Sequence, residues 1–302
     1  MANMAEELEI KLSLKPDDLI EALDWLRAQP EAREGNNKSL VNCYYDTPDA
    51  ELNRQQAALR VRQAGGRYIQ TLKTRGDFVD GAHRREEWEW PVSGPSLSLG
   101  LLADTPLEDR INLARLAPVF ETNFTRQVVM LDDGEAVIEC AVDEGVIVAG
   151  GQEKPLHEVE FELVSGDASR LLVWAEKLAR RCPVFLNLIS KAEQGYYLAG
   201  IHTAEPVAAE NANASDRKHD DLDRLLQRLS NAWLEHKSVS LEGLDIQVLG
   251  VQAEACGMGQ SFAALVEVLA EGHPLQELLT RPELGQCQLS LLASRARRSL
   301  NP

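Results

Sequence analysis

Charged side chains at strand spacing are the first feature of this sequence that could do chemistry. Near the N-terminus, Glu7, Glu9 and Lys11 alternate with apolar residues that begin at Leu8. A period of two is typical of a β-strand, and it places the three charges on one face. That face is either a solvated surface or the lining of an interior site, and one strand alone does not distinguish the two.

The same spacing recurs along the chain, and the charges are sorted by sign. Arg60 and Arg62 form a basic pair, whereas Glu158, Glu160 and Glu162 form an acidic row. A solvated face usually mixes signs, because like charges directly opposite each other destabilise a sheet. The other charged residues at strand spacing are Lys73, Arg85, Glu87, Arg126, Glu139 and Asp143. This sorting of charges by sign is a reason to consider an interior site, although it does not exclude a solvated surface.

An interior with an acidic and a basic wall would suit one kind of ligand. Clustered carboxylates in a confined space need divalent cations, and ligand sets made only of oxygen suit Mg²⁺ or Mn²⁺. Guanidinium groups match phosphate oxygens two at a time, while lysines act as point charges. A polyphosphate bridged by metal is the ligand that would use both walls.

The elements that must position these charges predict an antiparallel sheet in the first 200 residues. We expect about eight strands, with tight turns at Gly65-Gly66, Asp133-Gly134 and Glu144-Gly145, and two or three helices that include 16–29 and 167–181. A sheet of this size is large enough to close into a barrel. The pattern predicts an α+β fold for this part of the chain.

Beyond about residue 217 the hydrophobic pattern is helical only. A polar stretch at 204–216, rich in Ala, Glu and Asn, predicts a linker. We therefore expect one domain at 1–203 and a small all-α module at 217–302.

Composition narrows the classes of function. The net charge of −17 argues against a nucleic-acid partner, which normally meets a basic face. No apolar run approaches the length of a membrane span, and the acidic N-terminus does not resemble a signal peptide. The five scattered cysteines form no CxxC pair and suit a reducing compartment, so we expect a cytoplasmic protein without a membrane partner. Nothing in the sequence indicates an oligomeric state.

Taken in order, the charged motifs resemble those of the CYTH superfamily, the triphosphate tunnel metalloenzymes. ELEIK looks like the ExExK signature of that family, and seven further stretches follow in the family's order: LRVR, TLKT, HRREEW, FTRQ, IECAVD, HEVEFEL and SKAEQGY. ExExK alone is a weak motif, whereas the ordered set over about residues 5–200 is specific. The likeness is greatest to the inorganic triphosphatase branch and implies an eight-stranded antiparallel barrel that forms a tunnel with flanking helices.

The resemblance also implies roles for individual residues. The basic residues expected to bind the triphosphate are Lys11, Arg60, Arg62, Lys73, Arg85, Arg126 and Lys191. The carboxylates expected to hold metal are Glu7, Glu9, Asp143, Glu158, Glu160 and Glu162. Glu160, Glu162 and Lys73 are expected to serve catalysis directly. Glu87 and Glu139 either ligate metal or pair with the tunnel arginines, and the sequence leaves both readings open.

The implied activity is hydrolysis of tripolyphosphate to pyrophosphate and phosphate with Mg²⁺ or Mn²⁺, with two ions expected when substrate is bound. The alternatives are an organic triphosphate, such as thiamine triphosphate or a nucleotide, and a polyphosphate-binding module without turnover. The tail contains WLEHK, which resembles the opening of a CHAD domain, a helical bundle associated with polyphosphate. Because this tail is short and acidic, we favour a degenerate, structural module over an active binder.

Overall fold

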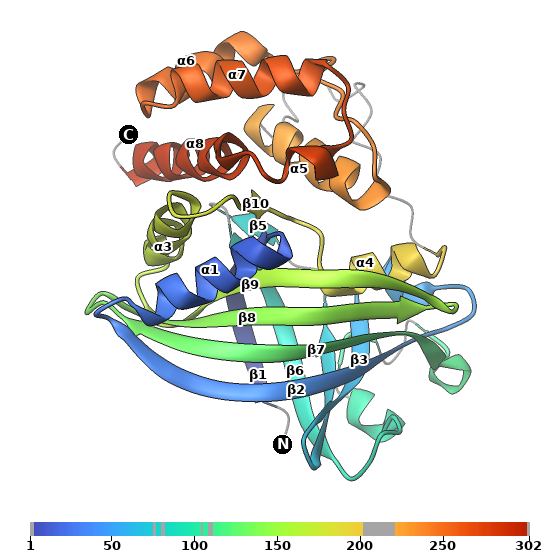
Figure 1. Cartoon of the computed structure of the whole chain (residues 1–302). Coiled ribbons are helices and arrows are strands. Elements are labelled where there is room, and N and C mark those ends of the chain that lie inside the picture. The colour runs from blue at the N-terminus through green and yellow to red at the C-terminus, as the bar shows by residue number, and fades with distance from the viewer. Residues whose placement is uncertain are drawn as a thin grey trace.

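Eight antiparallel strands close into a barrel in the part of the chain that the structure describes. This computed structural model describes residues 3–74, 77–79, 82–103, 105–107, 111–201 and 221–300. In order around the barrel the strands are β1 (Asn3–Ser13), β9 (Gln152–Gly166), β8 (Ala136–Ala149), β7 (Ala117–Asp132), β2 (Ala32–Asp46), β3 (Ala58–Ala64), β4 (Arg67–Lys73) and β6 (Ala82–Val92). Pairing of β6 with β1 closes the ring. The predicted α+β fold with an eight-stranded antiparallel barrel is confirmed (Figure 1).

Short elements flank the barrel. Strand β5 (Asp77–Val79) pairs with β6, and strand β10 (Phe185–Leu186) pairs with the end of β1. The flanking helices are α1 (Pro16–Arg27), α2 (Glu51–Arg54), α3 (Ser169–Ala179) and α4 (Lys191–Leu198), with 3₁₀ turns η1 (Leu99–Leu102) and η2 (Leu113–Arg115). Helix α1 begins at Pro16, where a missing backbone N–H costs nothing, and it has acidic residues in its first turn.

Strand β8 continues through a position where the sequence predicts a turn. Glu144 and Gly145 lie inside β8, and the chain turns instead at Gly150 and Gly151, which both have positive φ. A Cβ at Gly145 would lie only 2.1 Å from the carbonyl oxygen of Asn123 on β7. Glycine is therefore needed here for close contact between strands, and the predicted turn was wrong.

The outer face of the barrel carries the apolar half of the alternation. Helices α1 and α3 cover fully buried residues of two strands, namely Ile10 and Leu12 of β1 and Phe161 of β9. Trp174 of α3 is also fully buried. A second apolar cluster covers the outside of β3, β4 and β6 and includes Leu59, Leu72, Trp88, Leu102 and Leu107. Because successive strand residues face opposite sides, the charged residues point into the barrel.

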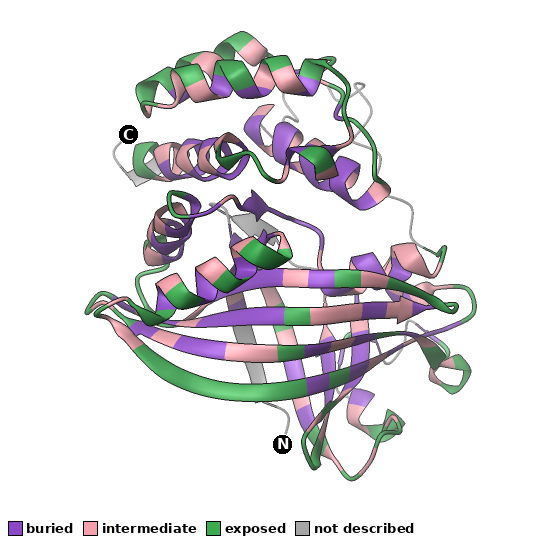
Figure 2. Ribbon diagram, in the orientation of Figure 1, coloured by how far each residue is buried: buried purple, intermediate pink, exposed green. Residues whose placement is uncertain are grey.

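The C-terminal helices pack on one side of the barrel and share its largest apolar core. They are α5 (Asp221–Glu235), α6 (Ile246–Ala255), α7 (Gly259–Ala270) and α8 (Pro282–Leu300), with the 3₁₀ turn η3 (Leu275–Leu278). Leu229 of α5 and Leu289 of α8 belong to the same buried cluster as Trp174 and Phe185. Figure 2 shows buried residues along α5 and α8, the tail helices that lie next to α3 and β10. The predicted linker at 204–216 lies outside the described residues.

In the described ranges, no helix is both long enough and apolar enough to cross a membrane.

Candidate functional site

The barrel interior collects the charged residues that strand spacing singled out. Glu7, Glu9 and Lys11 of β1 are 8%, 4% and 2% exposed, and Glu158 and Glu160 of β9 are also buried. Burial of this many charged groups is costly unless they are paired or bind a ligand. The solvated alternative for these strand faces is therefore excluded by where the residues lie.

One group of interior charges is centred on Glu7. Lys73 Nζ lies 2.7 Å from Glu7, and Arg85 Nε lies 2.8 Å from it and bridges to Glu9 through its terminal nitrogen. Burial by itself would raise the pKa of Glu7, but Lys73 and Arg85 outweigh it and hold that pKa well below its usual range. Glu87 contacts the same group at 3.4 Å from Lys73. The group therefore joins strands β1, β4 and β6 through alternating charges.

A second group surrounds Lys191, the first residue of α4. Its ammonium lies 2.9 Å from Asp143, 2.8 Å from Glu158 and 2.6 Å from Glu160. Arg126 binds Asp143 with two hydrogen bonds of 2.8 and 2.7 Å and also contacts Glu160. Burial would raise the pKa of Glu160, but Lys191 and Arg126 hold it well below its usual value. Three carboxylates and two cations thus share a small volume at one end of the barrel.

Helix α4 brings Lys191 into this end. Ser190 caps the helix, and Glu193 completes a reciprocal capping box with it. Gly195 sits directly on the ring of Phe120, where a Cβ would lie 2.1 Å away. In the sequence, only the family resemblance assigned Lys191 to the interior site. In the structure, the Lys191 side chain is only 8% exposed.

The basic wall includes arginines that face one another. Arg60 lies 3.3 Å from the Tyr44 hydroxyl and 3.8 Å from Glu87, whereas Arg62 donates to the neutral amide oxygen of Asn42 at 2.7 Å. Burial, together with the charges of Arg60 and Arg126, lowers the pKa of Arg62 to about 10. These guanidinium groups repel each other in the barrel interior, and a bound polyanion would relieve the repulsion.

Carboxylates on three neighbouring strands crowd together, as the arginines do on the basic wall. Strand register places Glu162 opposite both Glu9 and Glu139. Burial, together with the charges of Glu7 and Glu9, raises the pKa of Glu162 to about 7. Burial also raises the pKa of Glu9, and the attraction of Arg85 does not offset this effect. This side of the lumen is short of positive charge.

The donor set in the lumen fits a hard divalent cation by its chemistry. The clustered groups are carboxylates, which supply the oxygen ligands that Mg²⁺ and Mn²⁺ prefer. Among the described residues, no group of three or more carboxylate, histidine or cysteine side chains is arranged to hold a metal ion as it stands. Five of the six proposed ligands are instead paired with Lys73, Arg85, Arg126 or Lys191: Glu7, Glu9, Asp143, Glu158 and Glu160. Metal binding at these carboxylates would therefore require some of the present ion pairs to exchange partners.

Sequence reasoning missed several polar residues that support the charged ones. Asn42 and Tyr44 lie opposite Arg62 and Arg60 in the β2–β3 register and contact them directly. Gln194 of α4 donates to Glu158 at 2.8 Å. The alternation of β2 could have revealed Asn42 and Tyr44, since they share the parity of the lumen face. Gln194 carries no comparable signal in the sequence.

A known protein family matches the part of the chain that forms the barrel. Residues 5–196 match the CYTH domain family. The inorganic triphosphatase of Haemophilus influenzae is 36% identical over 197 residues, which are 65% of this chain and 55% of that protein, so the match spans about half of the relative's length.

Similar solved structures include a Hippeastrum protein described as a candidate adenylyl cyclase with a dominant triphosphatase activity. It is 20% identical with a TM-score of 0.49, over 65% of this chain and 97% of that one. The Mimivirus capping enzyme triphosphatase is 10% identical with a TM-score of 0.35, over 58% and 88% of the two chains. Similarity at this level carries no argument about the site. The family match runs from β1 into α4 and covers more than half of the sequence, and the chain therefore belongs to the CYTH domain family.

Proposed function

We propose that this protein is an inorganic triphosphatase that hydrolyses tripolyphosphate to pyrophosphate and phosphate inside the barrel. The observation that carries the proposal is the half-buried guanidinium of Arg62, which donates to the neutral amide oxygen of Asn42 at 2.7 Å and whose pKa is lowered first by burial and then by the charges of Arg60 and Arg126. A chain of closely spaced phosphates would satisfy these guanidinium groups two oxygens at a time. The inorganic triphosphatase activity named for the Haemophilus influenzae relative supports the same assignment.

The basic residues of the lumen bind the substrate in this proposal. They are Lys11, Arg60, Arg62, Lys73, Arg85, Arg126 and Lys191. Lys73, Arg85, Arg126 and Lys191 are engaged by carboxylates in the structure, so the entering phosphates compete with those carboxylates for them. This exchange brings the negative charge of the substrate to sites where compensating cations already lie.

The carboxylates released by that exchange hold divalent metal. The proposed set is Glu7, Glu9, Asp143, Glu158, Glu160 and Glu162, with Mg²⁺ or Mn²⁺ as the cation and two ions when substrate is bound. When bound, the metal neutralises the charge on the transferred phosphoryl group and lowers the pKa of water. Glu87 and Glu139 orient the neighbouring cations; Glu87 contacts Lys73 and Arg60 at 3.4 and 3.8 Å.

The chain's own residues then position the reaction. Glu160 and Glu162 lie two residues apart on the lumen face of β9, where they can orient the attacking water. From β4, Lys73 supplies a positive point charge to the other side of the phosphoryl group. Phosphoryl transfer depends mainly on positioning and charge stabilisation, so no nucleophilic side chain is required.

The proposed roles divide the chain into two parts. We infer that residues 1–203 carry the chemistry and that the helices of 217–302 serve a structural role. The apolar core that α5 and α8 share with α3 and β10 supports a structural role. An acidic tail is also a poor surface for a polyanion.

A phosphate-release panel tests the assignment. Tripolyphosphate, ATP, thiamine triphosphate and long-chain polyphosphate are each assayed with Mg²⁺ and with Mn²⁺. We expect kcat/KM for tripolyphosphate to exceed the value for every other substrate by at least about tenfold, equivalent to ~1.4 kcal/mol of transition-state stabilisation. Equal values for tripolyphosphate and an organic triphosphate would contradict the inorganic assignment.

A further inference from the structure

The segment from the last residue of β10 to the start of α4 connects the tail helices to the tunnel. It comprises residues 186–190, which we call the Lys191 lead, and it ends directly before Lys191. On its tunnel side, the Asn187 N–H donates to the Lys11 carbonyl at 3.1 Å, and the Lys11 ammonium donates to the Ile189 carbonyl. The Asn187 side chain donates to Ser13 Oγ at 3.0 Å. Strand β1 thus fixes one edge of the lead.

The tail helices fix the other edge. On α8, Gln288 accepts a hydrogen bond from the Leu186 N–H at 2.9 Å and donates one to the Leu186 carbonyl at 3.0 Å. On α5, Ser230 Oγ accepts one from the Leu188 N–H at 3.0 Å. Gln288 therefore pairs with both backbone groups of Leu186 as a neighbouring strand would, and Ser230 adds one further acceptor, although both residues come from helices.

The two polar residues are placed where the helices are otherwise apolar. Gln288 is 2% exposed and Ser230 is fully buried, within a cluster formed by residues such as Leu229 and Leu289. A polar group in such a place is unfavourable unless it is hydrogen-bonded, and here its partners are the backbone groups of the lead. Removing either side chain would leave buried backbone groups of the lead without that partner.

Helix α8 also approaches the chain closely just before the lead. A Cβ at Gly285 would lie 2.3 Å from the carbonyl oxygen of Val184, so the helix backbone rests directly against this stretch. Only a glycine permits this distance, and one turn later Gln288 reaches Leu186. The contact is close enough that a shift of α8 would be transmitted to the lead.

We propose that Gln288 and Ser230 are positioning residues that act through Lys191. By fixing the lead from outside the barrel, they set where the Lys191 ammonium lies among Asp143, Glu158 and Glu160. The tail thereby contributes to the active site although it supplies no group to the lumen. The kinetic consequence rests on the proposed triphosphatase function, whereas the mechanical one does not.

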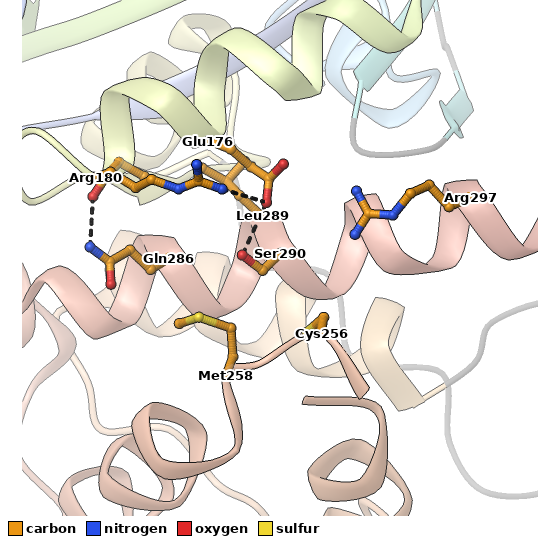
Figure 3. Close-up of a pocket in the computed structure, with 9 residues that line it drawn as sticks. Glu176, Arg180, Cys256, Met258, Gln286, Leu289, Ser290 and Arg297 are labelled. Carbon is orange, nitrogen blue, oxygen red and sulfur yellow. Dashed lines mark hydrogen bonds and ion pairs between the residues drawn. The ribbon is translucent and has the colours of Figure 1, made fainter. Parts of the chain in front are cut away.

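The kinetic test compares full-length variants with a matched control. Gln286 lies on the same helix, lines the pocket of Figure 3, and donates its hydrogen bond to the Ala179 carbonyl of α3 at 3.0 Å instead of to the lead. Small displacements caused by remote residues can cost up to about 100-fold in rate. We expect Gln288→Ala and Ser230→Ala to raise KM for tripolyphosphate about tenfold, and Gln286→Ala to change it less than about twofold.

A double-mutant cycle separates positioning from general destabilisation. If Gln288 acts through Lys191, adding Gln288→Ala to Lys191→Met should change kcat/KM by less than about twofold, because the coupled residue is already gone. An additive loss would overturn the proposal. So would a folded Gln288→Ala and a folded Ser230→Ala that both keep the wild-type KM.

Hydrogen exchange tests the same contact without any substrate. In Gln288→Ala the Leu186 amide should exchange at least about tenfold faster than in wild type, and in Ser230→Ala the Leu188 amide should do so. Amides of β8 serve as the internal reference. Unchanged exchange at both positions would overturn the proposal. If the wild-type protein releases no phosphate from any triphosphate, the proposed function fails, and the exchange rates still decide this inference.

Discussion

Lys73 Nζ on β4 lies 2.7 Å from each carboxylate oxygen of Glu7 on β1, across the intervening strand β6. The two residues are 66 positions apart in the sequence. Their contact means that a residue proposed to bind phosphate and one proposed to bind metal neutralise each other in this structure. Substrate and metal would then bind together. When the ion pair breaks, the phosphate takes the place of Glu7 at Lys73, and the metal takes the place of Lys73 at Glu7.

Replacing single carboxylates tests the acidic wall. Glu9→Gln and Glu160→Gln nearly preserve size while removing charge. We expect each to lower kcat by about 100-fold or more, because metal stabilisation of transferred charge is worth several kcal/mol. Glu153→Gln is the matched control, since Glu153 is exposed on the same strand as Glu160. Wild-type kcat in a folded double variant would show that these carboxylates are not needed for hydrolysis.

The basic wall should respond differently. Arg62→Met removes a guanidinium that Arg60 and Arg126 repel, so the substrate-free protein should lose little stability despite the lost contact with Asn42. Tripolyphosphate binding should weaken, with KM rising about tenfold or more, because a phosphate contact present in the ground state is lost. Thermal unfolding and steady-state kinetics measure the two effects. A normal KM would remove Arg62 from the substrate site.

Two glycine-to-alanine changes should have opposite signs. Gly195→Ala places a methyl group 2.1 Å from the Phe120 ring and should destabilise the fold by about 1–3 kcal/mol through overpacking. Gly250→Ala in α6 meets nothing within 4 Å and should stabilise by roughly 0.5–1 kcal/mol through helix propensity. Urea unfolding gives both values. A neutral Gly195→Ala would mean that α4 is not seated tightly on the barrel.

The β7–β8 turn should give the fold a measurable acid dependence. Burial would raise the pKa of Asp133, but hydrogen bonds from Trp174, the Ala136 N–H and Arg170 outweigh it and hold the pKa below 3.8. Because the folded pKa is the lower one, the stabilisation is fully present above about pH 4 and is lost as pH falls through the folded pKa.

Asp133→Asn should therefore cost about 1.5–3 kcal/mol at pH 7, the range for hydrogen bonds to charged groups. The difference from wild type should shrink at pH 3 and below. Urea unfolding of both proteins across this range measures the difference. A gap that stays constant down to pH 2 would show that the charge of Asp133 is not the source of its contribution.

Strand alternation predicts much of the site and little of its pairing. It places Glu7, Arg60 and Glu160 on one face because successive residues of a strand point to opposite sides. It does not say which cation meets which carboxylate, since that depends on register between strands distant in sequence. Gly145 was misread because a glycine needed for close strand contact and a glycine needed for a turn give the same local signal.

Polar residues on helices were harder still to interpret. Lys191 opens a short helix, and its burial among three carboxylates arises from the way α4 seats on the barrel. Gln288 and Ser230 interrupt the apolar faces of their helices. In the sequence alone, the same interruption also fits a polar residue that reaches the surface. Their meaning appears only when the backbone groups that they pair with are known.

The apolar core shared by α3, β10, α5 and α8 has a consequence for how the molecule comes apart. Two parts that bury their surfaces against each other cannot melt in separate steps without exposing that surface to water. Heat should therefore produce one calorimetric peak, with equal calorimetric and van't Hoff enthalpies. Trp174 beside the barrel and Trp233 in α5 should lose their native fluorescence at the same temperature.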